Sequence, residues 1–150
     1  MNRVWKPNVT VAALIERDGR FLLVEEETED GLRFNQPAGH LDEGESLVAA
    51  CAREALEETA WGFTPTALVG IYQWPRPQGD ITYLRFAFSG ELGTHEAGRA
   101  LDTGILRAVW KTLDEIRACA DRHRSPLVSQ CVSDYLAGRR YPLELIRHYD

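Results

Sequence analysis

Residues 46–59 constrain the fold most, because core-facing residues recur there at helical spacing while three glutamates crowd the second half. Ser46 is the expected N-cap, since its hydroxyl can accept a hydrogen bond from a free backbone N–H of the first turn. At about 100° per residue, the apolar positions form one stripe on the helix. The stripe consists of Leu47, Val48, Cys51, Ala52, Ala55 and Thr59.

Three glutamates, Glu54, Glu57 and Glu58, form a second stripe beside the apolar one, and Glu58 lies at the half-shielded boundary. Like charges at this spacing cost about a few tenths of a kcal/mol per pair, and the helix C-terminus adds to the cost. Arg53 offsets part of this charge. A hard divalent cation such as Mg²⁺ would offset the rest, whereas a solvated acidic face is the alternative that the helix alone leaves open.

The rest of the chain predicts an α/β (α+β) fold, with a mixed β-sheet sandwiched between helices, in a single domain over residues 1–150. Strands are predicted at 9–15, 21–24, 66–74, 82–92 and 105–110, with turns at 18–19 and 75–80. A short helix should begin at Thr112, and another should cover 126–137 and stop at Gly138. The polar residues 25–33 predict a loop, and 34–39 contains too many breakers for a long strand.

Charge and cysteine content narrow the classes of partner. A formal net charge of −6 argues against nonspecific binding of a nucleic acid polymer, but carboxylate-bound metal still allows a small phosphorylated substrate. Cys51, Cys119 and Cys131 match no zinc pattern, so we expect free thiols in a reducing cytoplasm. No apolar run approaches the roughly 20 residues of a membrane span. The sequence is compatible with a monomer or a homodimer.

The segment that begins at residue 39 resembles the Nudix box of the Nudix hydrolase superfamily. That box runs glycine, five residues, glutamate, seven residues, Arg-Glu, an apolar residue, any residue, Glu-Glu, any residue, glycine. The positions that match in register are Gly39, Glu45, Arg53, Glu54, Ala55, Glu57 and Glu58. Ala60 stands at the final glycine position, and alanine can stay helical, which would move the helix end toward Gly62.

Flanking segments are similar to the NudJ-type phosphatase branch of this superfamily. They are residues 35–41, 73–74, 84–86, 124–128 and 140–144, and the likeness extends from about residue 6 to residue 146. The resemblance implies Mg²⁺-dependent release of phosphate, with Mn²⁺ as a substitute metal. The implied substrates are nucleoside tri- and diphosphates and the pyrimidine pyrophosphate of thiamine metabolism.

The resemblance also implies roles for the box residues, in a loop–helix–loop. The implied metal ligands are Glu54, Glu57, Glu58 and the backbone carbonyl of Ala38. The three glutamates and Arg53 form the implied catalytic group, with Arg53 orienting the carboxylates. Gly39 and Glu45 are implied to be structural, and Glu45 would tie the loop to the helix.

Several residues are candidates for the general base. A glutamate near other carboxylates has a raised pKa, and a raised pKa suits a general base. Glu57 or Glu58 is the first choice, and Glu91, Glu96 and Asp102 are alternatives outside the box.

Substrate contacts are predicted from aromatic residues that can stack on a ring and basic residues that can hold phosphate. The candidates are Arg33, Phe34, His40, Trp74 and Arg85, with Tyr72 and Arg76 as further members of these two types. The alternative for the aromatic residues is a place in the core. The alternative for the arginines is plain surface charge, and the alternative for His40 is a structural role in the loop.

Two other functions stay open. One is a Nudix pyrophosphohydrolase of another specificity, such as ADP-ribose, a dinucleotide or an oxidised nucleotide. The other is a non-catalytic nucleotide-sensing Nudix module, although such modules commonly lose box glutamates that this chain keeps.

Overall fold

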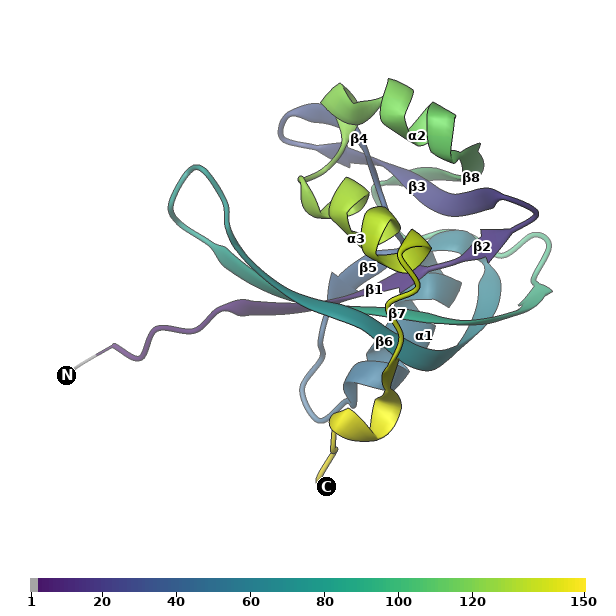
Figure 1. The fold of residues 1–150 in the computed structure, drawn as a ribbon. Coiled ribbons are helices and arrows are strands. Elements are labelled where there is room, and N and C mark those ends of the chain that lie inside the picture. Colours follow the sequence, from purple (N-terminus) through teal and green to yellow (C-terminus); the bar gives the residue numbers. More distant parts are fainter. Residues whose placement is uncertain (1–2) are drawn as a thin grey trace.

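The strands form two sheets in the computed structural model, which describes residues 3–150, so residues 1 and 2 of the predicted domain lie outside it (Figure 1). The five-stranded sheet has the order β5 (Ala38–His40), β1 (Asn8–Leu14), β7 (Thr82–His95), β6 (Trp61–Pro75), β9 (Tyr141–Pro142). The second sheet contains β2 (Glu16–Arg17), β3 (Arg20–Thr28), β4 (Gly31–Asn35) and β8 (Ile105–Thr112). The first sheet is mixed, because β1 and β7 are parallel while β1 and β5 are antiparallel.

Three α-helices cover the sheets: α1 (Leu47–Thr59), α2 (Leu113–Ala118) and α3 (Leu127–Leu136). Two short 3-10 helices are also present in the described residues: η1 (Ala120–Arg122) lies between α2 and α3, and η2 (Leu143–Leu145) follows β9. Both α1 and α3 pack on β1 and β6, and α2 packs on β8. The predicted mixed sheet between helices is therefore confirmed, with the strands divided between two sheets. No helix within residues 3–150 is long and apolar enough to cross a membrane.

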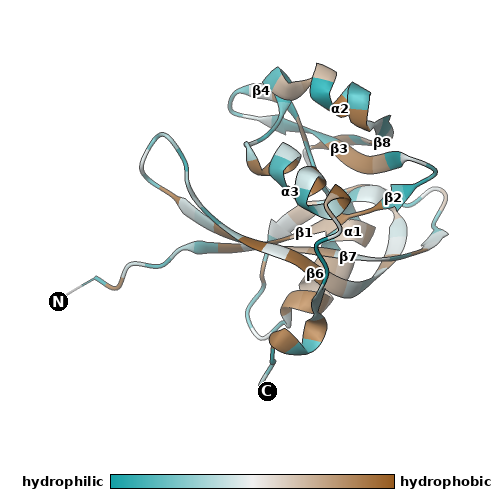
Figure 2. Cartoon of the chain, viewed as in Figure 1, coloured by the Kyte–Doolittle hydropathy of each residue, from teal (hydrophilic) through white to brown (hydrophobic). Residues whose placement is uncertain are grey.

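Strand β1 is buried on both faces. Successive side chains of a strand point to opposite sides, and those of β1 enter two different core clusters. Val11 and Ala13 pack in one core cluster with Cys51 of α1. Ala12 packs in a second cluster with Cys131 of α3. Figure 2 shows hydrophobic residues along β3 and β6, and also on the helical turn near the C-terminus. Both cysteines are free thiols, as predicted.

Helix α1 begins where the sequence predicts, since the Ser46 side chain accepts a hydrogen bond from the Ala49 N–H at 3.0 Å. The predicted strands 66–74, 82–92 and 105–110 are also confirmed, within the longer β6, β7 and β8. The predicted helices at 112 and 126–137 correspond to α2 and α3. Thr112 caps α2 through a reciprocal capping box with Glu115.

Helix α1 ends at Thr59, as the predicted range 46–59 has it, and does not continue toward Gly62. Ala60 instead adopts a left-handed conformation with φ of 63°. This conformation costs a non-glycine residue about 1–2 kcal/mol. The sheet enforces it, because Trp61 already begins β6 and the Ala60 carbonyl accepts a hydrogen bond from the Glu96 N–H at 2.8 Å.

The predicted loop at 25–33 is also wrong, because β3 extends to Thr28 and β4 begins at Gly31. Strand β3 lies between β4 and β8, so backbone pairing holds these polar residues in a sheet. Glu25 is buried there with Arg107 Nε donating to its Oε1 at 2.8 Å and Arg122 bonded to its other oxygen. These hydrogen bonds lower the pKa of Glu25, so the carboxylate stays charged inside the sheet.

Candidate active site

The acidic stripe of α1 packs against β5. The Glu54 carboxylate lies so close to Gly39 that a Cβ atom at residue 39 would be 2.2 Å from Glu54 Cδ. Glu58 Oε1 accepts a hydrogen bond of 2.9 Å from the Ala38 N–H. Glu54 and Glu58 are only 8% and 7% exposed. Glu58 is therefore more deeply buried than its half-shielded position on the helical projection predicts.

The backbone of Ala38 faces the same carboxylates. In the pairing of β5 with β1, the Ala13 N–H donates to the Pro37 carbonyl at 2.9 Å. Hydrogen-bonding residues alternate along an antiparallel strand, so the N–H and C=O of Ala38 both point away from β1. The N–H meets Glu58, and the carbonyl lies on the same edge of β5.

Arg53 connects the loop that precedes α1 to the acidic stripe. Its Nε and Nη2 donate to the two carboxylate oxygens of Glu45 at 2.7 and 2.9 Å, and Nη2 also donates to the His40 carbonyl. Its Nη1 donates to Glu54 at 2.7 Å and to Glu57 at 3.2 Å. Arg53 thus fixes the loop and orients two of the glutamates, and the same hydrogen bonds lower the pKa of Glu45.

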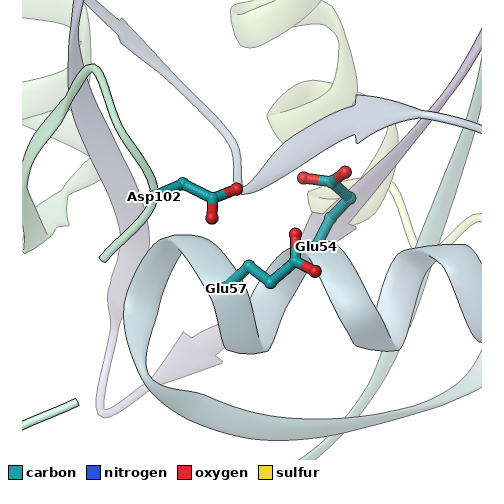
Figure 3. Close-up of side chains that lie close together, drawn as sticks. All are labelled: Glu54, Glu57 and Asp102. Carbon is teal, nitrogen blue, oxygen red and sulfur yellow. The ribbon is translucent and has the colours of Figure 1, made fainter. Parts of the chain in front are cut away.

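A fourth carboxylate joins the site from the loop between β7 and β8. Asp102 lies beside Glu54 and Glu57 (Figure 3), and the three carboxylates each offer an oxygen within 4.8 Å of the others. The Asp102 N–H donates to the Glu57 carbonyl at 3.0 Å. That carbonyl lacks a partner within the helix because it belongs to the last turn, so the end of α1 itself holds the loop in place.

The pKa values at this site reflect burial of negative charge. Burial is the main cause that raises the pKa of Glu58 to about 9; the Ala38 N–H opposes this rise, and the charges of Glu54, Glu26 and Asp102 contribute to it. Burial is also the main cause of the raised pKa of Glu54, against the opposing effect of Arg53.

A divalent cation fits this arrangement. The donors are carboxylate oxygens and one backbone carbonyl, which hard cations such as Mg²⁺ prefer. Buried carboxylates that gather without enough positive charge are costly, and Arg53 already bonds to Glu45. The residues that would hold the ion are Glu54, Glu57, Asp102 and Glu58, with Ala38 contributing its carbonyl.

Two of these carboxylates, Glu54 and Glu58, line a cleft. A cavity of about 360 Å³ is lined by Glu54, Glu58 and Ala38 at its acidic end. His40, Trp74 and Arg85 line it too, as candidate substrate contacts. A neighbouring cavity of about 860 Å³ is lined by Arg33 and Arg76.

Some substrate candidates are already bonded within the protein. Arg85 is 5% exposed, and its guanidinium donates to Gln36 Oε1 and Asn35 Oδ1, both at 2.9 Å. Arg76 pairs with Asp80. The Tyr72 hydroxyl donates to Asp134 at 2.7 Å.

Phe34 is not available for stacking on a substrate, so this prediction is wrong. It is 2% exposed in the second core cluster and lines neither cavity. Lys111 and Arg122 lie over its ring, with Nζ and Cζ each 4.6 Å from the centroid. Pairing of β4 with β3 directs this ring into the core.

Glu26, Tyr83 and Arg124 are among the cleft-lining residues that were not predicted from the sequence as site residues. Glu26 follows the buried Glu25 in β3, and its side chain points to the opposite face of the sheet. The alternation of side chains along a strand gives this direction, but the predicted loop at 25–33 does not. Tyr83 is the cross-strand partner of Trp74. Among the base candidates outside the box, Asp102 joins the carboxylates, while Glu96 pairs with Arg99 and Glu91 is exposed.

Comparison with known proteins identifies the family to which this chain belongs. The family model for the NUDIX domain matches residues 5–131. The chain belongs to the Nudix family. The predicted Nudix fold and the membership predicted from the box are therefore confirmed, and the chain is a Nudix hydrolase.

Among Nudix proteins, Phosphatase NudJ of Escherichia coli (strain K12) is 40% identical over 147 residues, 98% of this chain and 95% of that protein. Phosphatase NudJ of Shigella flexneri gives the same values. The solved structure of a NUDIX hydrolase from Nitrosomonas europaea is 54% identical with a TM-score of 0.93, covering 96% of this chain and 98% of that one. The predicted likeness to the NudJ branch is confirmed.

A more distant solved structure shares the fold alone. The MutT NUDIX hydrolase from Burkholderia pseudomallei is 18% identical with a TM-score of 0.73, and the match covers 87% of this chain and 98% of that one. The arrangement of strands and helices is thus kept across Nudix proteins whose sequences have diverged widely.

The Gly39→Ala variant should weaken Mg²⁺ binding by about 10- to 100-fold with little change in melting temperature. The new Cβ displaces the end of a flexible side chain, Glu54, rather than backbone. Isothermal titration of Mg²⁺ and thermal unfolding measure the two quantities. Gly62→Ala is the matched control, because a Cβ there has no neighbour closer than 3.6 Å. Unchanged Mg²⁺ affinity in Gly39→Ala would argue against a metal at Glu54.

The metal-free protein should lose stability relative to a Glu58→Gln variant as pH rises from 5 to 9. The pKa of Glu58 is raised from 4.5 to about 9 on folding, so the folded state keeps a proton that the unfolded state releases in this window. The free energy of unfolding should fall by up to about 1.4 kcal/mol per pH unit. Denaturant unfolding in EDTA measures it, with the exposed Glu43→Gln as control. Parallel curves for wild type and Glu58→Gln would contradict this assignment.

Proposed function

We propose that this Nudix hydrolase uses Mg²⁺, with Mn²⁺ as a substitute, to release phosphate from nucleoside tri- and diphosphates or from the pyrimidine pyrophosphate of thiamine metabolism. The observation that carries the proposal is the convergence of the Glu54, Glu57 and Asp102 carboxylates, of which Glu54 also lines the cleft. The likeness to proteins named Phosphatase NudJ supports the reaction class. Mg²⁺, when bound, would neutralise phosphate charge and lower the pKa of a bound water.

The chain's own residues divide the remaining work. Glu57 is half-buried and Asp102 exposed, so either carboxylate can reach a water in the open part of the site. We assign the proton-accepting role to Glu57, since Glu58 is engaged by the Ala38 N–H. Arg53 orients Glu54 and Glu57 through its hydrogen bonds. His40 lines the cavity beside them and is the proposed phosphate contact. Arg85 lines the same cavity with its guanidinium held by Gln36 and Asn35, and it is proposed to contribute positive charge toward the phosphates.

A product screen, which measures orthophosphate, pyrophosphate and nucleoside monophosphates by chromatography, tests the proposal against its alternatives. The panel holds nucleoside di- and triphosphates, thiamine-related pyrophosphates, ADP-ribose and a dinucleotide, each with Mg²⁺ and with EDTA. We expect Mg²⁺-dependent orthophosphate from the first two groups. Hydrolysis confined to ADP-ribose or the dinucleotide would instead favour another pyrophosphohydrolase, and stoichiometric binding without turnover would favour a nucleotide-sensing module.

Glu57→Gln should lower turnover by orders of magnitude, about 100-fold or more, because it removes one carboxylate charge and the proposed proton acceptor. The side chain is half-buried at the helix surface, so the fold should remain intact by circular dichroism. Glu43→Gln makes the same chemical change at an exposed position outside both cavities and should keep wild-type turnover. Near-normal turnover of Glu57→Gln would remove this residue from the site.

A further inference from the structure

The two cavities are parts of one cleft, since both are lined by Trp74, Tyr83, Arg124 and Ser125. The acidic end lies in the smaller cavity, and the larger one continues past these shared residues. A ligand held through its phosphates near Glu54 and Glu58 would therefore place its remaining part beside them.

Trp74 and Tyr83 form a fixed aromatic surface at this junction. They are cross-strand partners in β6 and β7, with ring centroids 6.1 Å apart and ring planes within 16° of parallel. Both are half-buried, and neither belongs to the two core clusters. The pair stands near the end of the β6–β7 hairpin, which projects from the body of the protein (Figure 1). Packing of the core does not account for two large rings in this position.

Arg124 reaches the same junction from the segment between η1 and α3. Its backbone N–H donates to the Phe34 carbonyl at 2.8 Å, which fixes the segment to β4. The Nη1 atom of its guanidinium lies 3.6 Å from Glu26 Oε1. A guanidinium plane stacks well on flat rings, so the cleft presents aromatic faces on one segment and a planar cation on the other.

We infer that Trp74 and Tyr83, together with Arg124, determine specificity by holding a planar heterocycle joined to the substrate's phosphates. This inference rests on the proposed function and deepens it. The cleft then selects pyrophosphates that carry a nucleobase or a free pyrimidine ring over those that carry an alkyl group. Stacking tolerates different rings because each has a π-face, so several bases should be accepted.

The test compares a pyrimidine nucleoside diphosphate with methyl diphosphate, which lacks a ring. The quantity measured is the ratio of kcat/KM for the two substrates. Trp74→Leu and Tyr83→Leu should each lower this ratio by roughly 5- to 100-fold, the usual value of one stacked base, mainly through a higher KM for the nucleotide. Tyr83→Phe should retain it. Trp5→Leu is the matched control, because Trp5 is 66% exposed and lines neither cavity.

Two results would overturn the inference: an unchanged ratio in both leucine variants, or an equal loss of kcat/KM on both substrates. If wild type hydrolyses neither substrate, the proposed function fails separately. Equilibrium binding of the nucleoside diphosphate with Mg²⁺ then decides. Affinity weakened in both leucine variants but kept in Trp5→Leu supports the inference, and equal affinity in all of them refutes it.

Discussion

The close contact between β5 and the acidic stripe of α1 is the constraint on which the site depends. Only glycine at residue 39 leaves room for the Glu54 carboxylate. The contact removes Glu54 and Glu58 from water, and a carboxylate without water needs a cation, a hydrogen-bond donor or a proton. The Ala38 N–H and Arg53 satisfy part of this need. The remaining negative charge makes the cleft receptive to a divalent ion.

The end of α1 has an equally large influence, because it positions both β6 and the loop that carries Asp102. The left-handed Ala60 turns the chain from the helix straight into β6. The Glu57 carbonyl holds the loop that carries Asp102. Strand β6 then runs on to Trp74, which pairs with Tyr83 beside the cleft. One helix terminus thus connects the carboxylates to the aromatic surface proposed to select the substrate.

Much of this could be predicted from sequence, because the signals were local. Ser46, the helical spacing of the apolar stripe and the strand patterns all act over a few residues, and they located α1 and most strands. Predictions failed where a distant partner reversed a local preference. Arg107 and Arg122 stabilise Glu25 in a strand, where the polar sequence had predicted a loop. Phe34 was misjudged because strand pairing, not residue type, sets its direction.

The sequence by itself determined which carboxylates share one helix face, since helical periodicity fixes the positions of Glu54, Glu57 and Glu58 relative to one another. Only the tertiary structure decided how deeply each is buried and which residues from elsewhere join them. Asp102, Glu26 and Tyr83 come from separate strands and loops, and their places depend on strand register and loop docking. Those depend on contacts between residues far apart in the chain, which no local pattern encodes.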